Sequence, residues 1–299
     1  MNKVIVTGGS GFVGKRLQKL KPNWVYPTSS QLNLNNYERC VSYLVSEKPD
    51  AVIHLAARVG GIKDNSEKPA EFFYQNMTMN TNIVQACYGA GVKRLLASLS
   101  TCAFPDVLDV YPFDEEDLLN GPPAKTNRAY GFTKRALYIQ IQSYRKQFGL
   151  NYSCFCPSNL YGPEDHFDPE KSHFVPASIK KIHEAEDGTT VEFWGTGNPL
   201  RQQLYVDDLC KIIPVLLEKH NTDSPLIVAP DENLSIREMA TVCRSIIGRK
   251  VTFSFNGNLD GQYRKDGSNA KFKELVPSFF FTPFKEGLQK TYTWYKERL

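Results

Sequence analysis

A phenol and an ammonium group lie four residues apart in the segment Tyr130-Gly-Phe-Thr-Lys134. On a helix this spacing places both side chains on one face, one turn apart. A lysine in this position stabilises a phenolate and lowers the tyrosine pKa, so that the tyrosine can give a proton to a carbonyl oxygen. The spacing alone is common, since Tyr292 and Lys296 share it; for that pair we expect surface and packing roles.

Ser100 and Cys102 follow an apolar run that predicts a strand over residues 94–98. Parallel sheets display their functional groups where the strands end, and from there Ser100 would hydrogen-bond the reacting oxygen. An isolated serine at such a position more often caps a turn. Because Ser100 occurs together with Tyr130 and Lys134, the catalytic interpretation is favoured.

A glycine-rich turn follows another strand-like run at the start of the chain, which reads Val4-Ile-Val-Thr-Gly-Gly-Ser-Gly-Phe-Val-Gly14. Residues without Cβ allow a tight turn and let the backbone approach a pyrophosphate at the N-terminus of the next helix. The turn therefore predicts a dinucleotide site. Its expected contact residues are Gly8, Gly9, Ser10, Gly11, Phe12, Val13 and Gly14.

The segment Pro27-Thr-Ser-Ser30 lies where an acidic residue normally binds the adenosine ribose of NAD. This segment contains no carboxylate that would repel a 2′-phosphate, and the nearby Lys15 or Arg16 could attract one. The sequence therefore favours NADPH/NADP over NADH/NAD as the cofactor.

The elements that must position these residues alternate along the chain. Strand-like runs at residues 24–26, 51–55, 94–98 and 152–156 are separated by helical stretches at 37–47, 72–90 and 127–148. This alternation predicts an α/β fold, a Rossmann-type doubly wound parallel sheet. We expect an NADP-binding Rossmann domain over residues 1–158, to which later segments return, and a smaller C-terminal α/β substrate-binding domain over 159–299.

Composition excludes several classes of function. A net charge of +4 with dispersed Lys and Arg residues argues against nucleic-acid binding. Without an apolar run long enough to span a membrane, or room for a signal peptide before the first strand, we expect a cytoplasmic protein. Seven cysteines without C-x-x-C spacing argue against a disulfide framework or zinc site. Asp207 and Asp208 predict a helix N-cap and first-turn charge rather than a metal site, and we expect no metal.

The glycine turn, Ser100, Tyr130 and Lys134 together resemble the extended short-chain dehydrogenase/reductase family, whose members modify nucleotide sugars. Further segments, across essentially the whole chain, resemble the GDP-L-fucose synthases of that family. They are Ala57-Arg-Val-Gly-Gly-Ile62, Ser100-Thr-Cys-Ala-Phe-Pro105, Pro157-Ser-Asn-Leu-Tyr-Gly-Pro163, Ser172-His-Phe-Val-Pro176 and Trp194-Gly-Thr-Gly-Asn-Pro-Leu-Arg201. The resemblance implies a bifunctional 3,5-epimerase and NADPH-dependent 4-reductase that converts GDP-4-keto-6-deoxy-D-mannose to GDP-L-fucose.

The resemblance also assigns roles to residues. Cys102 and His173 become the base and acid of epimerisation, and the role of each in each step stays open. The cofactor contacts are extended to Ser98, Leu99, Ser100, Thr101, Tyr130, Lys134, Pro157, Ser158, Asn159, Leu160 and His173. The GDP-sugar contacts become Lys181, Trp194, Arg201 and Asp260. Taken singly, Cys102 would be a buried thiol and His173 a loop residue that caps a helix.

Three alternatives stay open. A similar enzyme could act on UDP-4-keto-6-deoxyglucose and make UDP-rhamnose, and a plain 4-epimerase would need no second proton-transfer pair. The chain could also be a non-catalytic NADP-binding regulator, since fold alone does not prove chemistry.

Ser10, Pro27 and Ser29 replace arginines that bacterial members use for the 2′-phosphate. The resemblance further implies a homodimer that pairs through the helices at 127–148 and 72–90.

Overall fold

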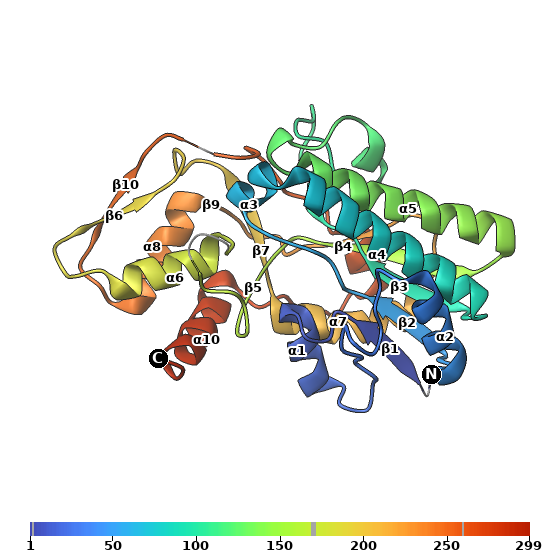
Figure 1. Cartoon of the computed structure of the whole chain (residues 1–299). Coiled ribbons are helices and arrows are strands. Elements are labelled where there is room, and N and C mark those ends of the chain that lie inside the picture. The colour runs from blue at the N-terminus through green and yellow to red at the C-terminus, as the bar shows by residue number, and fades with distance from the viewer. Residues whose placement is uncertain (2, 169–171, 259) are drawn as a thin grey trace.

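A five-stranded parallel sheet forms the centre of the larger half of the molecule (Figure 1). The computed structural model describes residues 1, 3–168, 172–258 and 260–299. The strand order is β1 (Val4–Thr7), β2 (Ala51–His54), β3 (Arg94–Ser98), β4 (Asn151–Pro157) and β8 (Leu226–Val228). Nearly every residue of these strands is buried, as expected for parallel strands that are covered on both faces.

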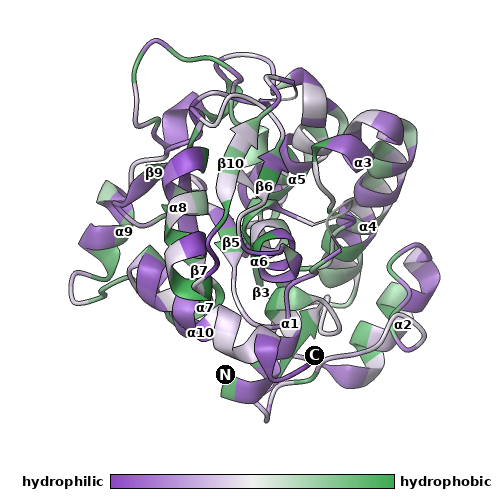
Figure 2. Ribbon diagram, turned by 90° about the vertical axis from the view of Figure 1, so that its left-hand side faces the viewer, coloured by the Kyte–Doolittle hydropathy of each residue, from purple (hydrophilic) through white to green (hydrophobic). Residues whose placement is uncertain are grey.

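Helices cover both faces of this sheet. One face packs against α2 (Tyr37–Glu47), α4 (Pro69–Gly89) and α5 (Arg128–Phe148). The other packs against α1 (Phe12–Leu20), α7 (Val206–Lys219) and α9 (Ala270–Leu275). The helices carry both polar and apolar residues, as amphipathic covering helices must (Figure 2). The predicted doubly wound α/β fold is confirmed.

The smaller half has an apolar core of its own, built around Ile179, Phe193, Met239 and Leu288. Its helices are α6 (Phe174–Glu184), α8 (Ile236–Ile247) and α10 (Phe284–Lys296). Its strands are β6 (Thr190–Phe193) with β10 (Thr252–Phe255), and β5 (Asn159–Tyr161) with β7 (Leu200–Tyr205) and β9 (Asn233–Ser235). Short connecting elements are α3 (Ile62–Glu67), η1 (Thr101–Ala103), η2 (Glu115–Leu119) and η3 (Lys125–Asn127).

One predicted strand is wrong. Residues 24–26 form only a bridge, in which Val25 exchanges backbone hydrogen bonds with Val4 and Val6 of β1. Pro22 and Pro27 lie on either side, and proline cannot donate a backbone hydrogen bond to extend the pairing. The segment nevertheless lies where the doubly wound topology needs it, on the side of β1 away from β2.

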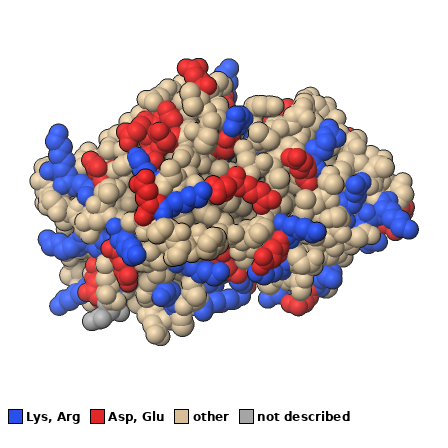
Figure 3. Space-filling view, turned by 180° about the vertical axis from the view of Figure 1, so that it is seen from behind, with Lys and Arg blue, Asp and Glu red and all other residues tan. Residues whose placement is uncertain are grey.

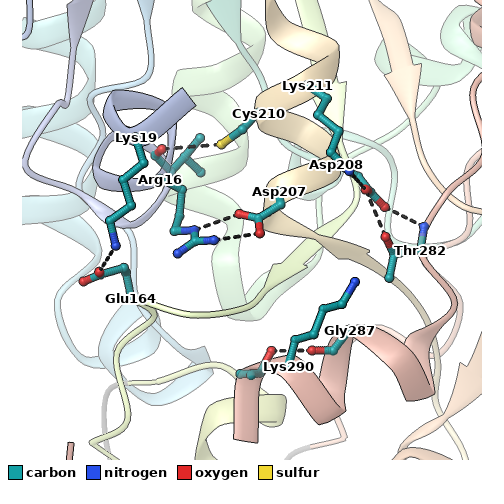
Figure 4. A network of polar contacts seen from close by, with 12 residues as sticks. Arg16, Lys19, Glu164, Asp207, Asp208, Cys210, Lys211, Thr282, Gly287 and Lys290 are labelled. Carbon is teal, nitrogen blue, oxygen red and sulfur yellow. Dashed lines mark hydrogen bonds and ion pairs between the residues drawn. The ribbon is translucent and has the colours of Figure 1, made fainter. Parts of the chain in front are cut away.

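The prediction that Asp207 or Asp208 caps a helix is also wrong. Tyr205 is the N-cap of α7, and both aspartates lie in the first turn. Figure 4 shows their partners: Asp207 accepts two 2.7 Å hydrogen bonds from Arg16 of α1, and Asp208 accepts from the backbone and side chain of Thr282. The two carboxylates therefore tie α7 to α1 and to the segment before α10.

Positive and negative side chains alternate over the face seen in Figure 3. Within the part of the chain that the structure describes, no helix is long and apolar enough to cross a membrane. Six of the seven cysteines are buried, and Cys102 is partly exposed.

Arg94, the first residue of β3, fastens the sheet to the end of α7. Its buried guanidinium donates to the carbonyl oxygens of Leu216, Leu217 and His220 over 2.9–3.0 Å. It also donates to Ser153 Oγ in β4 over 2.8 Å. Burial lowers the Arg94 pKa to about 10. A cation at a helix C-terminus satisfies carbonyls that have no partner in the helix.

Replacement of Arg94 by Met should lower the free energy of unfolding by about 3 kcal/mol, because several buried carbonyls lose their donor. Urea unfolding followed by circular dichroism measures this change. Arg39→Met, at an exposed position of α2, is the control and should change stability by less than about 0.5 kcal/mol. Equal stability of the two variants would contradict the role given to Arg94.

Candidate active site

A single cavity of about 790 Å³ collects the residues singled out from the sequence. It lies where the carboxyl ends of β1, β3 and β4 face segments of the smaller half. The predicted residues on its wall are Gly8, Gly9, Ser10, Gly11, Phe12, Val13, Gly14, Ser98, Leu99, Ser100, Thr101, Cys102, Tyr130, Lys134, Pro157, Ser158, Asn159, Leu160, His173, Lys181, Trp194, Arg201 and Asp260. The structure thus brings all of them together, although they span more than 250 positions of the sequence.

The glycine turn forms one end of the cavity. Gly8 has a φ of 78°, and its carbonyl accepts a 3.0 Å hydrogen bond from the Gly11 backbone. A Cβ at Gly14 would overlap the backbone of Gly8 and Gly9. No side chain caps α1 at Gly11, so its first backbone N–H groups are free to meet an anion. This cradle fits the pyrophosphate of a dinucleotide.

The wall beside the turn carries Pro27, Ser29, Asn33 and Asn35 and no carboxylate among the described residues. This fits a 2′-phosphorylated adenosine. The expectation that Arg16 could meet that phosphate is wrong, because the Arg16 guanidinium binds Asp207 in a bidentate pair. Lys15 has no such partner among the described residues.

Helix α5 places Tyr130 and Lys134 beside the residues that follow β3. Lys134 Nζ donates to the Ser98 carbonyl over 2.8 Å, and Arg135 Nε donates to the Ala103 carbonyl over 2.5 Å. Tyr130 and Lys134 are both buried, and Nζ lies 5.7 Å from the phenol ring centre. Ser100 lies close enough for its hydroxyl to interact with that of Tyr130.

The pKa of Tyr130 does not follow the prediction. Burial, followed by the nearby Cys102 thiol, raises the Tyr130 pKa in the free protein, and the Ser100 contact opposes this rise only in part. Burial also lowers the Lys134 pKa to about 8. Desolvation disfavours both charged forms and so outweighs the attraction between ammonium and phenolate. Tyr130 therefore carries its proton, as a proton donor must.

Cys102 lies in η1, two residues after Ser100, and its backbone N–H donates to Ser100 Oγ over 3.2 Å. Its thiol accepts a 2.8 Å hydrogen bond from Lys265 Nζ. Burial acts to raise the Cys102 pKa, but the charge and hydrogen bond of Lys265, with smaller contributions from Ser100 and Arg201, outweigh burial and lower it. The result is a thiol that gives up its proton more readily than an ordinary cysteine.

His173 is the N-cap residue of α6, and its side chain makes no capping hydrogen bond. The ring has surface open to the cavity, although many protein atoms surround it. This crowding, followed by the positive charge of Lys265, lowers the His173 pKa. The imidazole is therefore neutral in the free protein at pH 7.

The four residues assigned to the sugar nucleotide line the far side of the cavity. Lys181 Nζ lies 5.8 Å from the Trp194 ring centre and donates to the Glu192 carbonyl. Arg201 donates to the Leu200 carbonyl over 2.7 Å. Asp260 accepts from the backbone and the hydroxyl of Thr196 over 2.6 and 2.8 Å. Asp260 therefore holds the loop around Thr196 in place on the cavity wall.

The cavity is strongly positive. Its wall carries six cationic side chains, Arg58, Lys63, Lys134, Lys181, Arg201 and Lys265, and Asp260 is its one carboxylate among the described residues. Such a wall favours polyanionic ligands. In the described part of the chain no group of three or more His, Cys, Asp and Glu residues could hold a metal ion.

Sequence reasoning missed Lys265. Its loop is 163 residues away from Cys102, and no spacing pattern points from one to the other. Two buried acceptors on the wall were also missed, Asn65 Oδ1 and Asn127 Oδ1, which have no hydrogen-bond partner among the residues that the structure describes. Only a tertiary structure shows that these side chains share a cavity.

Comparisons with known proteins agree with this geometry. Residues 4–229 match the model of the NAD dependent epimerase/dehydratase family. A GDP-L-fucose synthase of Dictyostelium discoideum is 37% identical over 98% of this chain and 94% of its own length. One of Escherichia coli (strain K12) is 34% identical over 99% and 97%. The crystal structure of a GDP-L-fucose synthetase from Naegleria fowleri bound to NADP has a TM-score of 0.90 at 34% identity and covers 99% of this chain and 93% of that one.

The matches to the three GDP-L-fucose synthases and synthetases span nearly the whole of both chains, at identities that establish common descent. The chain therefore belongs to the NAD dependent epimerase/dehydratase family and, within it, to the GDP-L-fucose synthases.

Proposed function

We propose that this enzyme epimerises C3 and C5 of GDP-4-keto-6-deoxy-D-mannose and reduces the C4 ketone with NADPH to give GDP-L-fucose. One observation carries the proposal. The reducing group Ser100, Tyr130 and Lys134 and the proton-transfer pair Cys102 and His173 line one positive cavity, which also contains the glycine turn. A reductase or an epimerase alone would need only part of this set.

Reduction needs a hydride at C4 and a proton on the C4 oxygen. NADPH supplies the hydride when it is bound, with its pyrophosphate against the glycine turn. Tyr130 is protonated in its buried position and donates to the C4 oxygen, and Ser100 holds that oxygen by a second hydrogen bond. Lys134 then stabilises the phenolate, since its ammonium lies beside the ring.

Epimerisation uses the same carbonyl. The hydrogens at C3 and C5 flank C4, so removal of either one as a proton leaves an enolate whose oxygen Ser100 and Tyr130 stabilise. Cys102, with its lowered pKa, takes the proton, and His173 returns one from the opposite ring face. His173 must first become protonated, and the negative charge of a nucleoside diphosphate in the cavity favours this.

The cofactor and the GDP-sugar bind mainly to different halves of the chain. Residues 1–158 hold the cofactor, and residues 159–299 contribute most contacts to the GDP-sugar. Lys181 and Arg201 suit a diphosphate, and Trp194, 42% exposed, offers a ring face for stacking. The free thiols suit the cytoplasm, whose reducing conditions keep cysteines unpaired.

The enzyme also forms a homodimer through α4 and α5 in this proposal. These helices lie side by side (Figure 1). Their outer faces expose six large apolar residues, Phe73, Tyr74, Tyr88, Phe132, Ile139 and Phe148. Tyr88 stacks on Phe148 across the two helices with ring centres 4.2 Å apart, so these two rings form one apolar patch at the ends of α4 and α5. An exposed apolar patch of this kind marks an interaction surface.

The first test supplies GDP-4-keto-6-deoxy-D-mannose and NADPH, follows NADPH absorbance and identifies the sugar by NMR. GDP-L-fucose is the expected product. Tyr130→Phe should lower kcat for reduction by about a hundredfold or more, because the C4 oxygen loses its proton donor.

Tyr292→Phe is the matched control for Tyr130→Phe. Tyr292 has the same spacing to a lysine, but its hydroxyl bonds His183 in the smaller half, so turnover should not change. An unepimerised sugar as product would remove Cys102 and His173 from their roles. Activity with only a UDP-sugar would replace the substrate.

Binding of GDP should raise the pKa of His173 from its lowered value in the free enzyme, because the diphosphate favours the imidazolium. Titration of the imidazole Hε1 resonances by NMR, with and without GDP, measures the change. His54 and His220 are internal controls, since burial lowers the pKa of each to about 4 and neither lies on the cavity wall. If the His173 pKa is unmoved by GDP, the residue cannot serve as the acid.

The wild-type enzyme should elute with twice the 33.9 kDa mass of one chain, measured by light scattering. Phe148→Glu should shift it to the monomer, because a charge in the apolar patch opposes its burial. Phe280→Glu, at a position 87% exposed and outside the patch, is the control and should stay dimeric. A wild-type monomer at micromolar concentration would refute the dimer.

A further inference from the structure

Lys265 is a buried cation whose only hydrogen-bond partner among the described residues is a thiol. Its side chain is 7% exposed, and Nζ lies 2.8 Å from Cys102 Sγ. No carboxylate pairs with it in the described part of the chain. A buried charge without a counter-ion is costly. The Cys102 thiolate can supply that counter-ion.

The loop around Lys265 is held so that the ammonium stays on the thiol. Gln262 donates to the carbonyls of Pro105 and Asp106 over 2.8 and 3.0 Å. The Asp266 carbonyl accepts a 3.0 Å hydrogen bond from the Phe113 N–H, and the Asp266 carboxylate accepts from Arg264 over 2.9 and 2.6 Å. The nearest carboxylate in sequence is therefore already neutralised and does not compete with Cys102.

We infer that Lys265 is a positioning residue that holds Cys102 as a thiolate and so makes it the base in the epimerisation. The inference rests on the proposed function and assigns a residue that the sequence did not single out. The thiolate Sγ takes the proton from C3 or C5, and the electron pair of that C–H bond passes to the enolate with its charge on the C4 oxygen. Lys265 keeps its own protons throughout.

Other charged and titratable groups also face this thiol. Arg201 of β7 acts on it in the same direction as Lys265, and Ser100 adds a hydrogen bond. Tyr130 and Lys134 of α5 and Cys156 of β4 interact with it as well. Lys265 differs from the other cations because its ammonium donates a hydrogen bond directly to Cys102 Sγ. Its charge also opposes protonation of His173, so one ammonium keeps the two proton-transfer groups in different states.

The test is the pH dependence of thiol alkylation in the full-length enzyme without substrate. Iodoacetamide reacts with the thiolate, and Cys102 is the one cysteine of the seven that is not buried. Lys265→Met should slow alkylation at pH 7 about tenfold or more and move its midpoint to higher pH, since one pKa unit changes the thiolate fraction tenfold. Lys265→Arg should restore most of the rate.

Matched controls separate this role from a general effect on the fold. Lys63→Met removes another lysine from the cavity wall and should leave the alkylation midpoint unchanged, and Cys102→Ser should abolish the label. Met matches lysine in length, and the urea midpoint of each variant shows whether it folds. In Lys265→Met, the pKa of His173 should rise at the same time, measured by NMR.

A second readout uses the sugar. In D2O without NADPH, deuterium exchange at C3 and C5 of GDP-4-keto-6-deoxy-D-mannose should fall about tenfold in Lys265→Met at pH 7 and recover at higher pH. An unchanged alkylation rate and midpoint in Lys265→Met would overturn the inference. Because alkylation needs no substrate, it decides the role of Lys265 even if the substrate proposed above is wrong.

Discussion

The close approach of α5 to the end of β3 is the contact on which the proposed catalytic site depends. Gly131 permits it, because a Cβ there would overlap the Cys102 carbonyl. Lys134 and Arg135 then bond the carbonyls of Ser98 and Ala103 at the two ends of the same short segment. Held between these bonds, the segment presents its hydroxyl and thiol to the phenol of Tyr130, so a backbone constraint sets the distances between reacting groups.

Burial and charge act in opposite directions on the Cys102 pKa, but in the same direction on the pKa of His173. Desolvation keeps Tyr130 protonated and lowers the pKa of Lys134 and His173, and without a partner it would also keep Cys102 a thiol. At Cys102, Lys265 is the largest of the effects that oppose desolvation, and together they lower its pKa. One cavity can therefore contain both a protonated donor, Tyr130, and a proton acceptor, Cys102, as the proposed two-step chemistry at one carbonyl requires.

Both halves of the molecule must be fixed to each other for the site to exist, because His173 and Lys265 lie beyond the large sheet. Arg16 of the cofactor helix binds Asp207, and Lys19 of the same helix binds Glu164 over 2.7 Å, in the loop that follows β5 (Figure 4). The helix that begins at the glycine turn is thus anchored to the segments that lead into the smaller half.

Much of this protein could be predicted from its sequence by itself. The alternation of apolar runs and amphipathic stretches specified the doubly wound sheet, and the glycine turn and the Tyr130–Lys134 spacing located the catalytic end, because backbone geometry and side-chain period are local properties. The tertiary structure decided which partner each of the predicted residues contacts. It assigned Arg16 to Asp207 instead of a phosphate, reduced residues 24–26 to one bridge, and placed Lys265 on Cys102. Contacts between residues so far apart, and the pKa changes that burial causes, depend on how the whole chain packs, and no local pattern encodes them.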